Sequence, residues 1–296
     1  MQKLGKYLLT DNRRAAVTAL LCAVVPLIGG ILAAVIVGLI TLRKGYKAGL
    51  FVLAFVALPA ISLLVLHRFD YNLFDMLLLR CVLVWMFAVM LRRTHSWALT
   101  LELFVFLGAL VVVGIHLFIP DIAKIWVQLM SYYFKEYDWA TVFRLTPNQV
   151  THGIAELAPI GTGVAVTVLL VGAFFQLILA RWWEAALFYP GSLRQELVQI
   201  RVNRIMTIVV VLASVGLYWQ PAWLIDFYPL LILPFVVSGF SLLHKVGSSK
   251  KEWIFLVVAV YLALILLTFI VLLVLALLGL MDSWYNFRKR YPRLQT

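Results

Sequence analysis

The hydrophobic runs of this chain are about as long as a membrane is thick, and its cations fall between them. Of 25 Lys and Arg residues, only Arg80 lies deep inside a run. About 20 apolar helical residues cross a hydrocarbon core of about 30 Å, and flanking cations favour the cytoplasmic side. With 64% hydrophobic and 13% charged residues, the chain has too little charge for the surface of a soluble domain. We therefore expect an all-α, polytopic transmembrane helix bundle, formed as a single membrane domain over residues 1–296.

The composition also argues against several other classes of protein. The net charge of +12 is dispersed over many loops, whereas nucleic-acid-binding domains gather their cations in one stripe, so we expect no nucleic-acid partner. Cys22 and Cys81 lie in apolar runs without metal-ligand spacing, which predicts neither a disulfide nor a metal site. The sequence has no zinc-protease, nucleophile-elbow or Walker A motif, so neither an enzymatic activity nor a cofactor is predicted.

The first apolar run, residues 15–42, decides the predicted topology. As one helix of about 28 residues it would divide the loop cations evenly between the two sides of the membrane, which the positive-inside rule disfavours. Broken near Pro26, Gly29 and Gly30, it becomes a short helical pair. The N-terminus, the turn after Leu42 and the loop at 181–204 then all lie in the cytoplasm. We therefore predict the broken pair.

The last apolar run, Trp253 to Met281, bears on the number of crossings and on the side of the membrane where the C-terminus lies. As one straight helix it would be about 43 Å long, and a single crossing would place Arg288, Lys289 and Arg290 outside. A cytoplasmic C-terminus requires either that this run folds back or that an earlier short run does not cross. Eight to ten crossings are therefore expected.

Two segments are predicted to lie outside the hydrocarbon core. Residues 120–159 have apolar residues at helical spacing, which predicts an external amphipathic helix that either packs on its own bundle or docks another protein. Residues 181–204 form a cytoplasmic loop that opens on Arg181, Trp182 and Trp183, residue types that anchor chains at the interface. A turn at 190–192 follows, with Ser192 as the expected N-cap of an interfacial helix through Arg204.

The second segment and the end of the chain resemble a known family. The loop reads Arg181-Trp182-Trp183-Glu184-Ala185-Ala186-Leu187, then Tyr189-Pro190-Gly191-Ser192-Leu193-Arg194-Gln195-Glu196, then Arg201, and the chain ends with Leu278-Gly279-Leu280-Met281-Asp282 before Asn286, Arg288 and Arg290. Both stretches resemble the YybS-like predicted membrane proteins. The chain departs from that family at Glu184, where a neutral amide is common, and at Leu193, where an aromatic residue is usual.

The resemblance implies a bacterial inner-membrane protein of unassigned biochemical function. The YybS-like group is in turn similar to the substrate-binding membrane subunits of energy-coupling-factor vitamin transporters, which dock a shared transmembrane partner through small residues four positions apart. Small residues at this spacing let helix backbones approach closely, for internal packing or for docking a partner. Two rows have the spacing: Ala15, Ala19 and Ala23, and Gly30, Ala34 and Gly38.

Charged residues inside the apolar runs mark a candidate polar site. A charge at membrane depth is costly unless it is paired or hydrated. Arg80 and Asp226 are expected about 10 Å and about 5 Å below the outer ends of their helices. One hypothesis is a structural ion pair between them, and the other is an outward-facing pocket for a small solute, lined by Asp75, Arg80 and Asp226. His116 is interpreted as a hydrogen-bonded structural histidine, because no carboxylate lies near it on the same helical face.

Two functions remain open at this point. The first is a transporter-like or substrate-binding membrane subunit, which needs partner proteins because the chain has no nucleotide-binding domain of its own. The second is a membrane scaffold without transport activity that docks partners through 181–204 and 120–159. Both place the chain in contact with the lipid bilayer.

Overall fold

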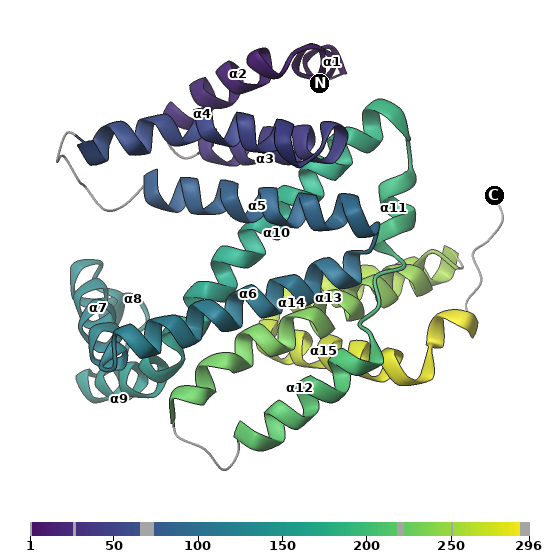
Figure 1. The fold of residues 1–296 in the computed structure, drawn as a ribbon. Coiled ribbons are helices and arrows are strands. Elements are labelled where there is room, and N and C mark those ends of the chain that lie inside the picture. Colours follow the sequence, from purple (N-terminus) through teal and green to yellow (C-terminus); the bar gives the residue numbers. More distant parts are fainter. Residues whose placement is uncertain (1, 26–27, 66–73, 218–221, 250, 291–296) are drawn as a thin grey trace. The chain divides into compact units, whose positions relative to one another are not determined.

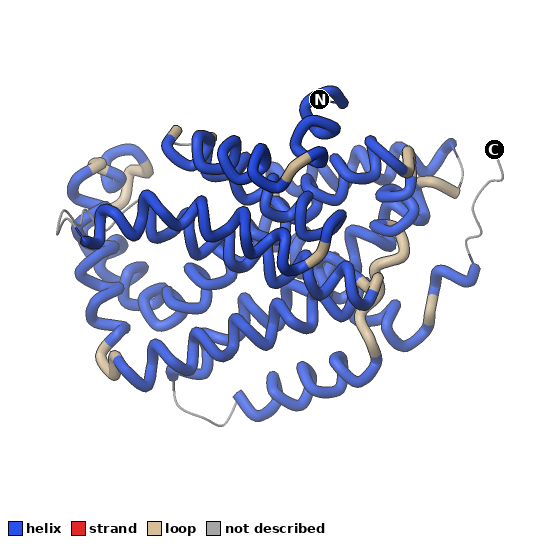
Figure 2. The backbone as a smooth tube through the Cα atoms, turned by 45° about the horizontal axis from the view of Figure 1, so that its top comes forward, coloured by secondary structure: helices blue, strands red, loops and turns tan. Residues whose placement is uncertain are grey.

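The described chain is helical, as the hydrophobic runs predict. The computed structural model describes all residues except 1, 26–27, 66–73, 218–221, 250 and 291–296. No strand occurs among the residues that it describes (Figures 1 and 2), which confirms the all-α fold. The contacts divide the chain into two compact units: unit 1 is Met1–Phe104 with Leu169–Ile200, and unit 2 is Val105–Val168 with Arg201–Thr296. The single membrane domain over residues 1–296 stays a prediction.

Unit 1 contains the predicted broken pair. The first apolar run forms two helices, α2 and α3, and a Cβ at Gly29 would overlap the carbonyl oxygen of Cys22. Glycine therefore permits the close turn between them. Besides parts of α6 (Trp97–Phe118) and α10 (Gly161–Phe188), the helices of this unit are α1 (Gln2–Thr10), α2 (Asn12–Val24), α3 (Gly29–Lys44), α4 (Tyr46–Val65), α5 (Phe74–Thr94) and α11 (Ser192–Leu197).

The two rows of small residues lie inside unit 1. Ala15, Ala19 and Ala23 are at most 5% exposed, on the helix that packs against α3 and α4. In the second row, a Cβ at Gly30 would press on Leu77 of α5, and a Cβ at Gly38 would press on Ala180 of α10 and on α5. Both rows thus let helices of the same chain approach closely.

Unit 2 holds residues 120–159 and the C-terminal helices. Residues 120–159, predicted to be an amphipathic helix, form three helices, of which α9 begins with a capping box between Thr146 and Gln149. Besides parts of α6 (Trp97–Phe118) and α10 (Gly161–Phe188), the elements are α7 (Ile122–Glu136), α8 (Trp139–Val142), α9 (Pro147–Leu157), η1 (Ala158–Ile160), α12 (Arg204–Leu217), η2 (Ala222–Phe227), α13 (Tyr228–Gly247), η3 (Lys251–Trp253), α14 (Ile254–Leu266), α15 (Thr268–Tyr285) and η4 (Phe287–Arg290).

The last apolar run folds back on itself. It is broken at Leu267, where α14 ends and α15 begins. Tyr261 of α14 contacts the ring of His244 in α13, and a straight helix would carry Arg288 about 40 Å beyond Tyr261. Arg288 instead donates to Ser241, one turn from His244. The C-terminal ends of α13 and α15 therefore meet at one end of unit 2, as the fold-back alternative requires.

Helices α13 and α15 are packed backbone to backbone. A Cβ at Gly239 would overlap the carbonyl oxygen of Leu275, and a Cβ at Gly279 would overlap that of Phe235. Glycine, which has no Cβ, lies at the crossing point of each helix and permits this close approach of the two backbones.

Four described helical segments are long and apolar enough to cross a membrane, and three shorter apolar helices accompany them. Much of their surface is apolar and exposed, for example Phe269 at 88% and Leu266 at 80%, which lipid would cover. The chain is thus an integral membrane protein. The expected eight to ten crossings remain a prediction. Among the described residues, four helical segments are long and apolar enough to cross: Trp97–Phe118, Pro147–Phe188, Leu224–Gly247 and Thr268–Tyr285.

Candidate functional site

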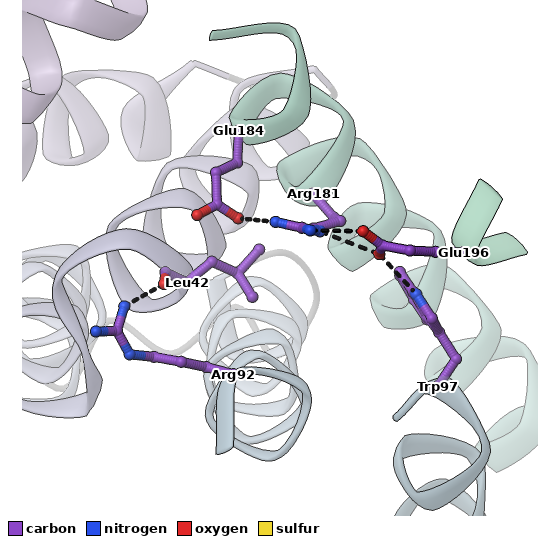
Figure 3. A network of polar contacts seen from close by, with 6 residues as sticks. All are labelled: Leu42, Arg92, Trp97, Arg181, Glu184 and Glu196. Carbon is purple, nitrogen blue, oxygen red and sulfur yellow. Dashed lines mark hydrogen bonds and ion pairs between the residues drawn. The ribbon is translucent and has the colours of Figure 1, made fainter. Parts of the chain in front are cut away.

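In unit 1, one arginine binds two carboxylates (Figure 3). Arg181 of α10 donates from Nη1 to Glu184 at 2.7 Å and from Nη2 and Nε to Glu196 of α11 at 2.5 and 3.1 Å. The indole of Trp97, at the start of α6, donates to the same Glu196 at 3.1 Å. These contacts fix three helices to one another, with two carboxylates sharing one guanidinium.

The family-motif residues around this network are placed differently from the prediction. Arg181, Trp182 and Trp183 lie inside α10, which continues to Phe188, and not in a loop. Trp183 is 5% exposed and packs beside Gly5 of α1, so tertiary contacts extend the helix past the apolar run. Trp182 is exposed.

The helix expected from Ser192 to Arg204 is also shorter than predicted. It ends at Leu197, and its N-cap is Gly191, at φ +86°, instead of Ser192. Glycine suits this position because the left-handed region disfavours other residues. Arg194 of this helix is exposed, whereas Leu193 is buried.

In unit 2, Arg201 binds the C-terminal end of α15. Arg201 donates from Nε to the carbonyl oxygen of Asp282 at 3.0 Å and from Nη2 to that of Ser283 at 2.7 Å. Thr207 donates to the Ser283 hydroxyl at 2.9 Å. A cation at the C-terminal end of α15 also suits the helix dipole.

A buried ion pair completes this second cluster. The Asp282 side chain is fully buried and accepts from Arg288 Nε at 2.6 Å. Arg288 also donates to the Ser241 hydroxyl and to the carbonyl oxygen of Ser238. The pKa of the Arg288 guanidinium is lowered, because the effect of burial outweighs the hydrogen bond to Asp282 and the charge of that carboxylate, which raise it. The pair ties η4 and the end of α15 to α13.

A third polar cluster contains Asp226. Its side chain is 1% exposed, and its Oδ2 lies 2.8 Å from His116 Nε2. Its Oδ1 accepts from the backbone N–H of Gly163 at 2.8 Å, where a Cβ would overlap the Asp226 carbonyl oxygen. Trp126 of α7 donates to Thr162 at 2.9 Å on the same turn of α10. His116 is hydrogen-bonded as predicted, but its partner is a carboxylate 110 residues away.

The residues of the predicted site, Asp75, Arg80 and Asp226, belong to different units. Arg80 lies in α5 of unit 1, half-buried, and its Nε has no hydrogen-bond partner among the described residues. Asp75 lies in the first turn of α5, and its side chain is outside the described part of the chain. Asp226 belongs to unit 2, where His116 and Gly163 bind both carboxylate oxygens. The pairing of Arg80 with Asp226 stays a prediction.

Helices α12, α13 and α15 line an open cavity of about 500 Å³ in unit 2. Val210, Phe235, Ala276 and Leu280 are among its lining residues, and Ser214 is the one that carries a side-chain polar group. The Ser214 hydroxyl donates to the carbonyl oxygen of Val210. The cavity is therefore apolar, and neither hydropathy nor motifs indicated it, because its walls are ordinary membrane-helix residues.

The described residues include no group of three or more His, Cys, Asp or Glu side chains placed to hold a metal ion. Comparison with protein-family models, curated proteins and solved structures finds no match to this chain. The fold defines the class, an all-helical integral membrane protein. A YybS-like assignment stays a prediction from the sequence.

Proposed function

We propose that this chain is a YybS-like, non-enzymatic subunit of the bacterial inner membrane, which binds an apolar or amphiphilic solute and works with a membrane protein partner. The supporting observation is the cavity between α12, α13 and α15. Its volume of about 500 Å³ falls in the range of small-molecule sites, which are mostly apolar and concave. The transporter-like role expected from the family resemblance requires such a site.

The lining restricts the class of solute. A charged group in this cavity would lose its hydration without gaining a partner, because the Ser214 hydroxyl is already bonded within its own helix. An alkyl chain or a ring system would instead replace lipid contacts with protein contacts. The solute proposed here is therefore apolar, in contrast to the charged pocket that the sequence suggested around Arg80.

Filling the cavity is expected to abolish solute binding while the protein stays folded. In Ala276→Phe the added ring would occupy the cavity and clash with its ligand. Photolabelling of the membrane-embedded protein with a diazirine-bearing hexadecanoate is expected to mark α12, α13 or α15 in the wild type. In the variant, that labelling should fall by at least about fivefold.

The matched control is Ile265→Phe on α14, whose side chain is 77% exposed and does not line the cavity. It is expected to label as the wild type does. Where Ala276→Phe does not fold, Val211→Phe serves, because Val211 lines the cavity and its side chain is 41% exposed. Labelling spread evenly over all lipid-facing helices, or unchanged by both cavity variants, would exclude the solute site.

A scaffold function is the competing proposal, and the surface of α7 and α8 supports it. Helix α7 has no buried residue. From its last turn onward, the rings of Tyr133, Tyr137, Trp139 and Phe143 follow one another at centroid distances of 6.0, 6.4 and 5.5 Å. Each of these side chains is at least 39% exposed. Exposed aromatic side chains are common in protein interfaces. Selective labelling of the cavity helices in the photolabelling experiment would favour solute binding over this alternative.

A further inference from the structure

Four helix ends meet in unit 1 and carry a dense group of cations. Lys44, at the end of α3, donates to Asn12 at the start of α2 at 2.7 Å. Arg93, at the end of α5, lies over the ring of Tyr46 at the start of α4, 5.5 Å from its centroid. Exposed cations of these four ends form what we call the cationic patch: Arg13, Arg14, Arg43, Lys44, Lys47, Arg92 and Arg93.

Several cations of the patch are held in fixed positions. The Arg43 guanidinium lies 3.9 Å from the ring centroid of Phe188. Arg92 donates to the carbonyl oxygen of Leu42 (Figure 3). Such contacts fix the orientation of long side chains before a ligand arrives, which lowers the entropy cost of binding one.

The carboxylates of unit 1 whose side chains are described leave most of this charge uncompensated. Asp11 accepts from the backbone N–H of Arg13. Glu102 is half-buried in α6 and forms no ion pair with a described residue. Glu184 and Glu196 are both bonded to Arg181. The C-terminal ends of α3 and α5 attract their own cations through the helix dipole, but that attraction cancels only a fraction of each charge. The patch is therefore strongly positive.

We propose that the cationic patch binds the phosphate groups of anionic membrane lipids. The patch includes the start of α4, which is apolar over Tyr46–Pro59. Lipid headgroups are found at the ends of membrane helices, and Tyr46 and Phe188 within the patch suit that interface. Leu50 and Phe51, one turn further along α4, are 48% and 39% exposed, so acyl chains would cover them next to the bound headgroup. A soluble anion would use the cations alone. This proposal does not depend on the solute cavity, which lies in unit 2.

Neutralising two cations tests the proposal. Arg43→Gln with Arg93→Gln is expected to weaken binding of phosphatidylglycerol to the solubilised full-length protein by about 25-fold, measured by native mass spectrometry. Each Lys or Arg near an anionic lipid surface contributes about 1 kcal/mol, which is about fivefold in affinity. Binding of phosphatidylcholine should be weaker in the wild type and should change little in the variant.

The matched control is Lys124→Gln with Lys135→Gln, which removes the same charge from exposed positions on α7 and should retain wild-type affinity. Equal phosphatidylglycerol binding by the Arg43, Arg93 variant and the wild type would overturn the proposal. Complete displacement of the lipid by millimolar inorganic phosphate would also overturn it, because the patch would then be a site for a soluble anion. Thermal unfolding of each variant verifies that the fold is retained.

Discussion

Replacing Asp282 with Ala is expected to lower the free energy of unfolding by about 3 to 5 kcal/mol. The substitution removes the carboxylate that faces Arg288 and leaves a guanidinium whose side chain is 11% exposed without its counterion. A buried charge that loses its partner is among the largest single-residue effects in proteins. Reversible unfolding of the detergent-solubilised protein, followed by circular dichroism, measures the loss.

Two comparisons isolate the buried charge as the cause. Asp121→Ala breaks the ion pair between Asp121 and Lys124, two side chains that are 74% and 77% exposed. It should lower the free energy of unfolding by less than about 1 kcal/mol. Replacing both members of the buried pair, Asp282→Leu with Arg288→Met, should recover a large part of the loss, because no unpaired charge remains. A cost for Asp282→Ala no greater than that for Asp121→Ala would contradict this account of the cluster.

The second large effect is expected at the crossing of α13 and α15. Gly279→Ala places a Cβ on the carbonyl oxygen of Phe235, and a backbone atom cannot move aside as a flexible side chain can. The two helices must separate, which we expect to cost about 2 to 3 kcal/mol through lost packing. The same unfolding experiment in detergent measures it.

Gly172→Ala in α10 is the matched control, because a Cβ at Gly172 meets no atom within 4 Å. Alanine is favoured over glycine inside a helix by up to about 1 kcal/mol, so this variant should be neutral or slightly more stable. If Gly279→Ala were as mild as Gly172→Ala, the close packing of α13 against α15 would be wrong.

Hydropathy and charge predicted the features that depend on local sequence. The broken first run follows from Pro26, Gly29 and Gly30, and the structure has two helices there. The fold-back at Leu267 appeared only as one of two alternatives, because the residues of that run are uniformly apolar and the cations beyond it were the sole indication.

The polar clusters could not be predicted because their members are distant in sequence. His116 and Asp226 are 110 residues apart, and Arg201 and Asp282 are 81 apart. A search along one helical face finds neither partner. Similarly, the spacing of small residues indicated packing faces on α2 and α3, whereas Gly239 and Gly279 belong to separate helices, so no spacing within one helix relates them.

The predicted topology places the cationic helix ends on the cytoplasmic side of the membrane. Cysteine accessibility in intact cells tests this most directly. Cys22 and Cys81 are first replaced by Ala, and single cysteines are introduced at Ser192, Ser248 and Asn148. Cysteines at 192 and 248 should resist an impermeant maleimide until the cells are opened, whereas a cysteine at 148 should react at once. Reaction at 148 and 192 from the same side would contradict the predicted topology.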